Sequence, residues 1–306
     1  MLTAPSLATL TWTWQGYRCR YTVMGSGQPL LLIHGFGASV GHWRQNIPVL
    51  AKAGYQVFAL DLLGFGASEK PPLDYCLELW QQQLHDFWAE NIARPTVLVG
   101  NSIGGLLSLM LLAAAPELAR AGVLINCAGG LNHRPEELPP PLRLVMGAFE
   151  TLVRSPLTGP LLFNLIRQKP LIRNSLSQVY RDRTAITPEL VEMLYRPACD
   201  RGAQQAFASI LTAPPGPRPA ELLPQITQPL LVLWGEDDPW TPIDGATIYR
   251  QLADQEARVQ FHAIPRAGHC PHDEKPALVN ALLLDWLQLL SSQPNILETA
   301  SSPARL

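Results

Sequence analysis

The stretch VLVGNSIGGLLSL, residues 97–109, is the part of the sequence that decides the fold. It begins with an apolar run typical of a buried strand and continues after Ser102 with the pattern of a buried helix. Gly100 and Gly104 flank the serine and leave room for a sharp strand-to-helix turn. Such a turn lifts a hydroxyl above the sheet edge, beside a helix N-terminus that favours developing negative charge. The pattern predicts that Ser102 is a nucleophile, and a helix-capping serine is the alternative.

The first half of the chain alternates between strand-like and helix-like segments. Near-continuous apolar strands that alternate with amphipathic helices indicate an α/β protein with a mostly parallel, doubly wound sheet, covered by helices on both faces. We expect the helix at 42–54 to end at Gly54, which accepts a left-handed conformation. The expected strands are 19–24 and 29–34, as neighbours, then 56–62, 96–100 and 123–128, and the other expected helices are 77–91 and the one that starts at 103.

The alternation stops in the middle of the chain. Between residues 131 and 227 proline punctuates several helical patterns, and strand patterns resume only at 229–235 and 258–264. The simplest interpretation is an α/β core formed by 1–130 and 228–290, with a helical lid inserted at 131–227. The polar tail, 291–306, is expected to be disordered.

Composition excludes several classes of function. The 306 residues carry a formal net charge of −2 without a run of Lys or Arg, so nucleic acid is not an expected partner. The five cysteines are widely spaced and lack a CxxC pattern, which favours a reducing compartment and predicts neither a disulfide framework nor a metal site. The first ten residues carry no basic side chain, and no apolar run is long enough to span a bilayer. We therefore expect an intracellular protein that is soluble or peripherally attached to a membrane.

A serine nucleophile needs a base, and the base needs an orienting acid. On a sheet of this kind the acid and then the base should follow the serine along the chain, each on a loop after a later strand. His269 lies in the loop after the last predicted strand and is the expected base. His262 lies inside the strand pattern, and His272 lies further along the loop.

The expected acid is Asp238, which follows the strand at 229–235. It precedes Pro239, and a residue before proline is held in an extended backbone outside any helix. Asp237 is interpreted as its solvated neighbour, and Glu236 remains an alternative. An acid can also stand at the end of the strand at 123–128, but that position offers the uncharged Asn126.

The site also needs donors for an oxyanion. HGFG, residues 34–37, follows directly on a strand, and its glycines allow a backbone N–H to face the site. We expect the N–H groups of Phe36 and Ile103 to be these donors. His34 is interpreted as a structural residue that holds the loop. Trp43 and Trp240, next to the catalytic loops, are candidates for lining the substrate pocket. This chemistry requires no metal and no organic cofactor.

Four motifs, HGFG, GNSIGG (100–105), GEDDPW (235–240) and AGHCPHDEKP (267–276), resemble the α/β-hydrolase superfamily over residues 15–290. The resemblance implies the α/β-hydrolase fold with a lid, and a Ser-His-Asp triad that works through an acyl-enzyme. A serine at the nucleophile position separates the chain from haloalkane dehalogenases and epoxide hydrolases, which place an aspartate there.

Three longer stretches, 33–51, 59–71 and the lid segment 179–223, resemble the pheophytinase and chlorophyll dephytylase group of photosynthetic organisms. This resemblance implies hydrolysis of the phytyl ester of chlorophyll or pheophytin, releasing phytol and the chlorin acid, in chlorophyll catabolism at the thylakoid. The plastid-targeting extension of plant members is missing, so the resemblance favours a cyanobacterial protein or a shortened form. Two other functions stay open: another acyl hydrolase, such as a small-ester esterase or a carbon–carbon bond hydrolase, and a non-catalytic ligand receptor.

The lid segment at 142–176 mixes large apolar residues with Arg and Lys at intervals. Such a segment can present an apolar face to a membrane or to a long alkyl chain while its cations stay at the interface. The alternative is that these residues pack on the core. A hydrophobic ester is therefore the expected substrate, with peripheral membrane contact through the lid.

Overall fold

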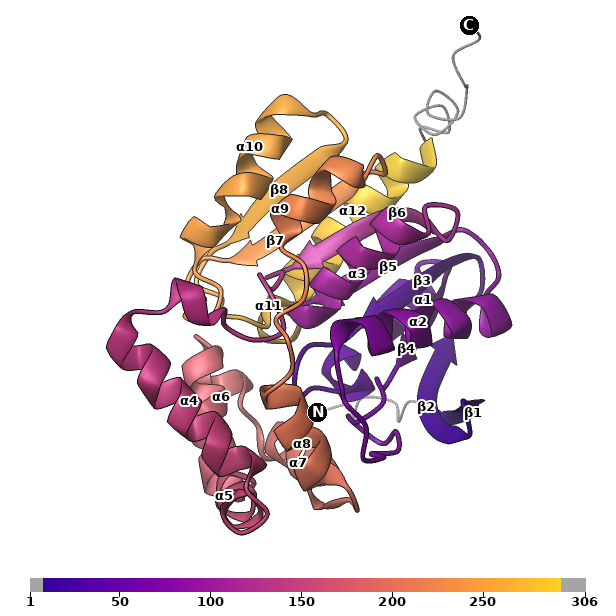
Figure 1. The fold of residues 1–306 in the computed structure, drawn as a ribbon. Coiled ribbons are helices and arrows are strands. Elements are labelled where there is room, and N and C mark those ends of the chain that lie inside the picture. The colour runs from indigo at the N-terminus through magenta and orange to yellow at the C-terminus, as the bar shows by residue number, and fades with distance from the viewer. Residues whose placement is uncertain (1–7, 293–306) are drawn as a thin grey trace, which may run out of the picture.

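The computed structural model describes residues 8–292 and places eight strands in one sheet (Figure 1). The strand order is β1-β2-β4-β3-β5-β6-β7-β8, in which β1, β2 and β4 are joined by antiparallel pairing and β3 to β8 run parallel. The strands are β1 Leu10–Trp14, β2 Tyr17–Met24, β3 Gln28–Ile33, β4 Tyr55–Leu60, β5 Thr96–Asn101, β6 Ala119–Ile125, β7 Leu230–Gly235 and β8 Val259–Ile264.

Both faces of the sheet are buried. Successive residues of β3 alternate between two apolar clusters, Leu31 and Ile33 on one face and Leu30 and Leu32 on the other. Helices α2, α3 and α10 cover the first face, and α1 and α12 cover the second. The bounds of these helices are α1 Ile47–Lys52, α2 Leu77–Asn91, α3 Ile103–Ala114, α10 Thr247–Gln255 and α12 Pro276–Ser292, with the short α11 at Pro271–Glu274. Burial on two faces explains why the parallel strands are nearly continuous apolar runs.

Two features of the sheet differ from the sequence-based expectation. β2 and β3, expected to be neighbours, are separated by β4, which pairs antiparallel with β2 and parallel with β3. The almost wholly apolar β3 suits a central position covered on both faces, whereas β2 buries only Cys19 and Thr22 and suits a place near the edge. The edge strand β1 was not expected, although its Thr–Trp alternation is a strand signal.

Most other predicted elements are present with small changes of boundary. α2 has the predicted bounds, and Gly54 adopts a left-handed conformation with φ +94° just beyond α1. The region 42–54 divides into a 3-10 turn at Val40–Trp43 and the short α1. The strand predicted at 123–128 ends instead at Ile125, because Asn126 turns the backbone with φ +43°.

The segment between β6 and β7 forms helices that stand off the sheet edge (Figure 1). The insertion has a small apolar cluster, which includes Val179, Tyr180 and Leu190 and also Cys270. The short α9 packs on α3 instead, so the end of the predicted lid range lies with the core. These helices are α4 Pro140–Arg154, α5 Thr158–Ile166, α6 Lys169–Val179, α7 Pro188–Tyr195, α8 Ala203–Leu211 and α9 Pro219–Leu222. Residues 293–306, nearly all of the predicted tail, lie outside the described residues.

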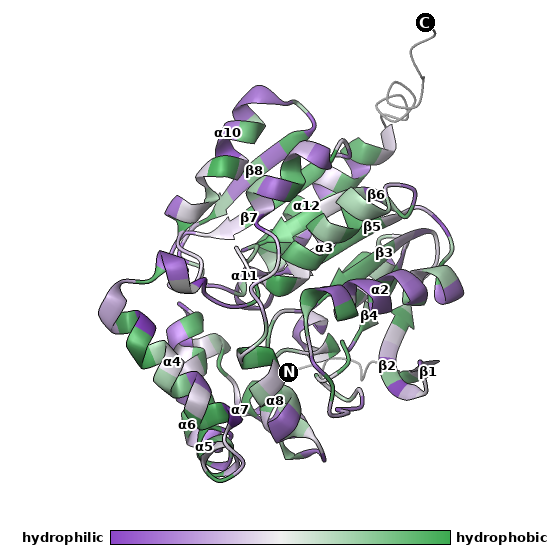
Figure 2. Cartoon of the chain, viewed as in Figure 1, coloured by the Kyte–Doolittle hydropathy of each residue, from purple (hydrophilic) through white to green (hydrophobic). Residues whose placement is uncertain are grey.

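Hydropathy follows this architecture (Figure 2). The central strands and α3 are mostly apolar, whereas α2 and α10 carry polar residues on their outer sides. Among residues 8–292 no helix combines the length and apolarity that crossing a bilayer requires.

Candidate active site

Ser102 occupies the turn between β5 and α3, with φ +57° and ψ −120°. A non-glycine residue rarely adopts this backbone conformation, and such strain is stored mainly at functional sites. The flanking glycines make the turn sterically feasible. A Cβ on Gly100 would lie 2.1 Å from the carbonyl oxygen of Gly104, and one on Gly104 would lie 2.2 Å from that of Ile33. Ser102 lies directly before the N-terminus of α3, as its N-cap residue.

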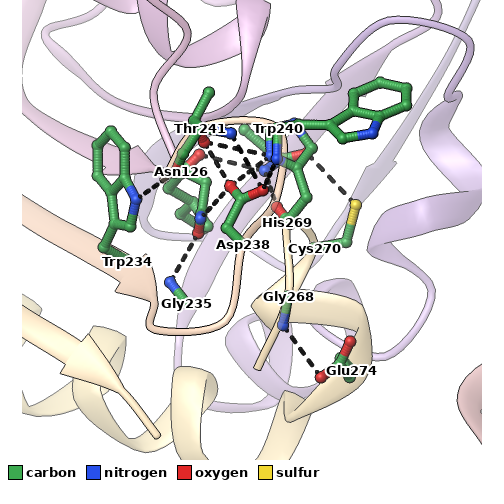
Figure 3. Close-up of polar contacts among 12 residues, drawn as sticks. Asn126, Trp234, Gly235, Asp238, Trp240, Thr241, Gly268, His269, Cys270 and Glu274 are labelled. Carbon is green, nitrogen blue, oxygen red and sulfur yellow. Dashed lines mark hydrogen bonds and ion pairs between the residues drawn. The ribbon is translucent and has the colours of Figure 1, made fainter. Parts of the chain in front are cut away.

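His269 and Asp238 form a buried pair at the carboxyl ends of β7 and β8 (Figure 3). The Nδ1 atom of His269 lies 2.7 Å from Oδ2 of Asp238. Asp238 is surrounded by donors and is therefore a carboxylate, which can only accept hydrogen bonds. The imidazole of His269 consequently carries its proton on Nδ1, and the lone pair of Nε2 is free to accept a proton. The pair thus has the geometry of a base held by an acid.

The Asp238 carboxylate accepts four further hydrogen bonds. Its Oδ1 accepts from the backbone N–H groups of Trp240, at 2.8 Å, and Thr241, at 3.1 Å. Its Oδ2 accepts from the Thr241 hydroxyl and from Nδ2 of Asn126, the latter at 2.6 Å. Burial acts to raise the pKa of Asp238, but the hydrogen bonds from His269 and Thr241 outweigh it and hold the pKa below its ordinary value. Asp238 is therefore held as a carboxylate.

Asn126 is a site residue that the sequence-based reasoning set aside for its lack of charge. Its Nδ2 donates to Asp238, and its Oδ1 accepts from the N–H of Gly235 at 3.0 Å. One side chain thus fixes both the carboxylate and the end of the strand that carries it. The left-handed φ of Asn126, which asparagine tolerates better than most residues, aims the amide at β7.

The acidic neighbours of Asp238 lie outside this arrangement. Asp237 is exposed and forms an ion pair with Arg181 at 2.9 Å. Glu236 is exposed as well. Of the three consecutive carboxylates, the structure brings only Asp238 to the histidine.

Asn101 connects the turn at Ser102 to the histidine loop. Its Nδ2 donates to the carbonyl oxygens of Ile125, at 3.1 Å, and His269, at 3.0 Å. The residue before the serine is therefore bonded to the backbone of the histidine, across 168 positions of sequence. This contact brings the turn and the histidine loop to the same edge of the sheet.

The two expected oxyanion donors lie beside this edge. Among residues 8–292 neither the N–H of Phe36 nor that of Ile103 has a hydrogen-bond acceptor. His34 supports the first of these loops: its Nε2 accepts from the N–H of Leu62 at 3.0 Å, and its Nδ1 lies 2.8 Å from the carbonyl oxygen of Gly35. Burial lowers the pKa of His34, which keeps it neutral in this role.

The two tryptophans expected to line the pocket have different surroundings. Trp240 is 52% exposed, and its ring centroid lies 5.7 Å from that of His269 (Figure 3). Trp43 is fully buried in the core cluster on the α1 and α12 face, with its ring 4.2 Å from His272. Trp43 therefore offers no exposed surface to a substrate, whereas Trp240 does.

The helical insertion is hydrogen-bonded directly to the histidine loop. The N–H of His269 donates to the carbonyl oxygen of Val179 at 3.0 Å. The buried carboxylate of Glu274 accepts from the N–H of Gly268 at 3.1 Å and from that of Arg181 at 2.7 Å. The end of α6 is thereby joined to the loop that carries His269.

Ser102 and His269 are buried beneath this contact. Two cavities of about 640 and 700 Å³ flank the insertion, the first lined in part by Tyr75 and Gln204 and the second by Asp61 and Met193. Neither cavity is lined by Ser102 or His269. The low exposure of Ser102 and His269 therefore limits the access of solvent to both side chains.

The surroundings of the site contain several aromatic side chains and few buried cations. The ring centroid of Phe36 lies 6.3 Å from that of Phe207 in α8. The ring centroid of Phe207 lies 5.2 Å from that of Phe163 in α5. Among the described residues the buried cations are Lys70 and Arg134. Lys70 is bonded to Asp200 and two carbonyl oxygens, and Arg134 to two carbonyl oxygens. In the same part of the chain no group of three or more His, Cys, Asp or Glu side chains could hold a metal ion.

Comparison with known proteins shows the family of the fold. A family model described as "Alpha/beta hydrolase family" matches residues 30–282. The pheophytinase of Arabidopsis thaliana chloroplasts is 29% identical, over 86% of this chain and 62% of that protein's own length. The 2-hydroxy-6-oxo-6-(2'-aminophenyl)hexa-2,4-dienoic acid hydrolase of Metapseudomonas resinovorans is 30% identical, over 85% of this chain and 84% of that protein. The solved CarC enzyme, a serine hydrolase involved in carbazole degradation, superposes with a TM-score of 0.74 at 26% identity, covering 93% of this chain and all of that one.

Proposed function

The chain belongs to the α/β hydrolase family, and from this premise we propose that it is a serine ester hydrolase with Ser102, His269 and Asp238 as its triad. The observation that carries the proposal is the buried His269–Asp238 pair, with 2.7 Å between Nδ1 and Oδ2, at the same sheet edge as a serine with φ +57°. An oriented imidazole at the same sheet edge as a serine with a strained backbone is the arrangement that activates a hydroxyl at neutral pH.

In the proposed reaction Nε2 of His269 takes the proton of Ser102 as Oγ bonds to the ester carbonyl carbon. The N–H groups of Phe36 and Ile103 hold the resulting oxyanion, and Asp238 stabilises the imidazolium. The carbon–oxygen bond to the alcohol then breaks, and the imidazolium returns the proton to the departing alcohol. Water repeats the sequence on the acyl-enzyme and releases the acid. These steps use no metal and no organic cofactor.

The surroundings of the site support a neutral, lipophilic ester as the substrate class. A negatively charged substrate needs a counter-charge in a buried site, and the two buried cations, Lys70 and Arg134, are already bonded to other groups. Phe36, Phe207 and the exposed ring of Trp240 instead provide apolar surface near the site. The insertion over the site acts as a lid in this proposal, because substrate reaches the buried Ser102 only when it moves.

Within this class we propose the phytyl ester of chlorophyll or pheophytin. The support is the pheophytinase of Arabidopsis thaliana, at 29% identity over 86% of this chain. A phytyl chain is long, branched and uncharged, and therefore fits the apolar surroundings described above.

A second candidate is hydrolysis beside a ketone. The Metapseudomonas resinovorans relative, at 30% identity, is named for a 2-hydroxy-6-oxo dienoic acid, a molecule with a ketone and no ester. Hydrolysis at that ketone breaks a carbon–carbon bond. Its carboxylate would need the free counter-charge that the buried cations of this chain do not supply, and we therefore place it second.

Pigment turnover and active-site labelling test the proposal together. The full chain is incubated with chlorophyll, pheophytin, short p-nitrophenyl esters and a 2-hydroxy-6-oxo dienoate, and the products are separated by chromatography. A fluorophosphonate probe should label the wild type and not Ser102→Ala. Ser108→Ala is the matched control, because Ser108 lies on α3 one turn beyond Gly104 and its hydroxyl donates to the carbonyl of Gly104. Ester cleavage by Ser102→Ala above background would refute the mechanism, and turnover of the dienoate alone would establish the second candidate.

A further inference from the structure

The outer surface of the insertion exposes an unusual amount of apolar area. Of the thirteen large hydrophobic side chains that are exposed among the described residues, eight lie between Leu142 and Leu171. Leu144, Leu157 and Leu161 are 77, 80 and 72% exposed. Single exposed leucines are ordinary, but clusters of this kind mark surfaces that bind a partner.

These side chains lie on regular helical faces. Leu161 and Leu165, four apart, share one side of α5, and Leu157, the N-cap residue of that helix, lies four positions before Leu161. Val145 and Leu152, seven apart, share one side of α4. Figure 2 shows the apolar residues along α4 interrupted by polar ones, on the outer side of the molecule in Figure 1. We call this surface the lid face; it consists of Leu144, Val145, Leu152, Leu157, Leu161 and Leu165.

The fold itself makes little use of the lid face. The only buried side chain of the fifteen-residue α4 is Val153. None of the lid-face residues belongs to the apolar clusters of the core or of the insertion. Packing within residues 8–292 therefore does not explain why these exposed positions carry leucine and valine.

The charge of this region is opposite to that of the rest of the chain. Residues 138–180 contain five cations and one acid, a net charge of +4, while the whole chain has −2. Among the described residues only Lys169 of these five has a carboxylate partner, Glu192. The four arginines donate to backbone carbonyls or face solvent, so their charge remains available. They are Arg143, Arg154, Arg167 and Arg173.

We propose that the lid face docks on an anionic lipid bilayer. The leucines would enter the boundary between headgroups and acyl chains, while the long arginine side chains keep their guanidinium groups among the anionic headgroups. A second copy of this chain is a poorer occupant, because it would bring two surfaces of net charge +4 together. Docking is independent of catalysis; only its purpose, delivery of a lipophilic ester from the bilayer to the lid, rests on the proposed function.

Vesicle binding by the full chain carrying Ser102→Ala tests this without any turnover. Sucrose-loaded vesicles of phosphatidylcholine, alone or mixed with phosphatidylglycerol, are sedimented and the bound protein is measured. We expect preferential binding to the mixed vesicles that weakens with added salt. Adding Leu157→Asp and Leu161→Asp together should lower the partition coefficient at least about tenfold, because each leucine loses its transfer into the apolar phase.

Two controls make the result specific. Leu289→Asp replaces a similarly exposed leucine on α12, at 51% exposure, and should leave binding within about twofold. Arg143→Gln with Arg154→Gln should lower binding to the mixed vesicles by about tenfold and leave binding to phosphatidylcholine unchanged. Circular dichroism melting curves verify that each variant is folded.

Three outcomes would overturn the proposal. The first is equal binding to neutral and anionic vesicles. The second is undiminished binding by the Leu157→Asp, Leu161→Asp protein. The third is absence of vesicle binding combined with a dimer, in sedimentation velocity, that the same two substitutions dissociate; the occupant would then be a second copy of the chain.

Discussion

At the scale of single residues, the Asp238 carboxylate is fixed before any substrate arrives. Both of its oxygens accept from the backbone or from side chains of the same small region, and one of them also holds Nδ1 of His269. Asn126 and Thr241 complete this arrangement. Preorganised groups of this kind stabilise charge that develops in a transition state without reorganising during the reaction. The orientation of His269 is therefore set by the protein rather than by substrate.

Replacing the acid should abolish most activity without unfolding the protein. Asp238→Asn retains shape but removes the negative charge and presents an amide that can hold the wrong imidazole tautomer. We expect kcat on an ester substrate to fall about 10³- to 10⁴-fold. Asp237→Asn, its exposed neighbour paired only with Arg181, should stay within about twofold. Equal losses for the two variants, measured by steady-state kinetics, would remove Asp238 from the proposed triad.

Two other histidines, His42 and His272, are buried near the site but have a structural role. Burial lowers the pKa of His42 to about 4 and that of His272 to about 3. Within residues 8–292 the Nδ1 atom of each ring has no hydrogen-bond partner. A protonated ring would place a buried charge where Nδ1 has no acceptor, so both histidines are held neutral in the folded protein.

Stability should consequently fall as the solution becomes acidic. An unfolded histidine takes up a proton near pH 6.5, whereas these two do so only near pH 4 and 3 when folded. The unfolded state therefore binds more protons below about pH 6.5, and the stability present above that pH is lost as the pH falls toward the folded values. Between about pH 6.5 and 5 each histidine should remove about 2 kcal/mol from the free energy of unfolding.

Urea unfolding across this pH range measures the effect. His272→Gln should flatten the pH dependence, while His133→Gln, a substitution of an exposed histidine, should leave it unchanged. A wild-type free energy of unfolding that does not change between neutral and mildly acidic pH would contradict the assignment.

At the scale of elements, the turn from β5 to α3 depends on close backbone approach. A Cβ on Gly104 would lie 2.2 Å from the carbonyl oxygen of Ile33 and 2.8 Å from that of His34. Both obstacles are backbone atoms at the end of β3 and the start of the loop that carries Phe36, so they cannot move aside without displacing that loop. The position of Gly104 therefore couples the turn at Ser102 to the loop of Phe36.

Gly104→Ala should be strongly destabilising, by about 3 kcal/mol or more, and should reduce labelling by a fluorophosphonate in the protein that still folds. Gly147→Ala is a matched control within a helix, because a Cβ there meets nothing within 4 Å. In α4 that change should stabilise the protein by about 0.5–1 kcal/mol. Thermal unfolding of both variants measures the difference, and similar effects of the two would refute the steric argument.

At the scale of the whole molecule, the insertion and the core meet at the histidine loop. The carbonyl of Val179 accepts from His269, the Tyr180 hydroxyl donates to Asp273 at 2.8 Å, and Glu274 bridges the loop to Arg181. Burial raises the pKa of Glu274, which the backbone donors of Gly268 and Arg181 partly offset. Movement of the end of α6 must therefore break hydrogen bonds that hold the loop of His269. Displacement of the insertion and the position of His269 are coupled in this arrangement.

Glu274→Gln tests this coupling. The amide can accept from one N–H but turns its NH₂ group toward the other, so either Gly268 or Arg181 loses its acceptor. We expect kcat to fall about tenfold, with fluorophosphonate labelling slowed in proportion, since a lost buried bond to a charged group is worth about 1.5–3 kcal/mol. Glu189→Gln, an exposed acid of the same insertion, should leave both rates unchanged. Normal labelling of the Glu274 variant would show that the bridge has no part in placing His269.

The fold and the candidate site differ in how far they could be predicted. The helix α2, the turn at Ser102 and the order of serine, acid and histidine follow from local patterns along the chain. The role of Asn126 could not be predicted, because its bond to Asp238 joins residues 112 positions apart. The burial of Trp43 against His272 could not be predicted either, because a tryptophan next to a catalytic motif can face either the core or the pocket.

The sequence by itself determined what depends on neighbouring residues. Glycine spacing around Ser102, apolar periodicity and the concentration of cations at 138–180 all act over a few positions, and each is legible without a fold. Only the tertiary structure decided the insertion of β4 between β2 and β3, the hydrogen bond from Asn126 to Asp238, and which leucines of the helical insertion stay exposed. These depend on which distant groups compete for the same space and the same hydrogen bonds, and that competition exists only once the chain is packed.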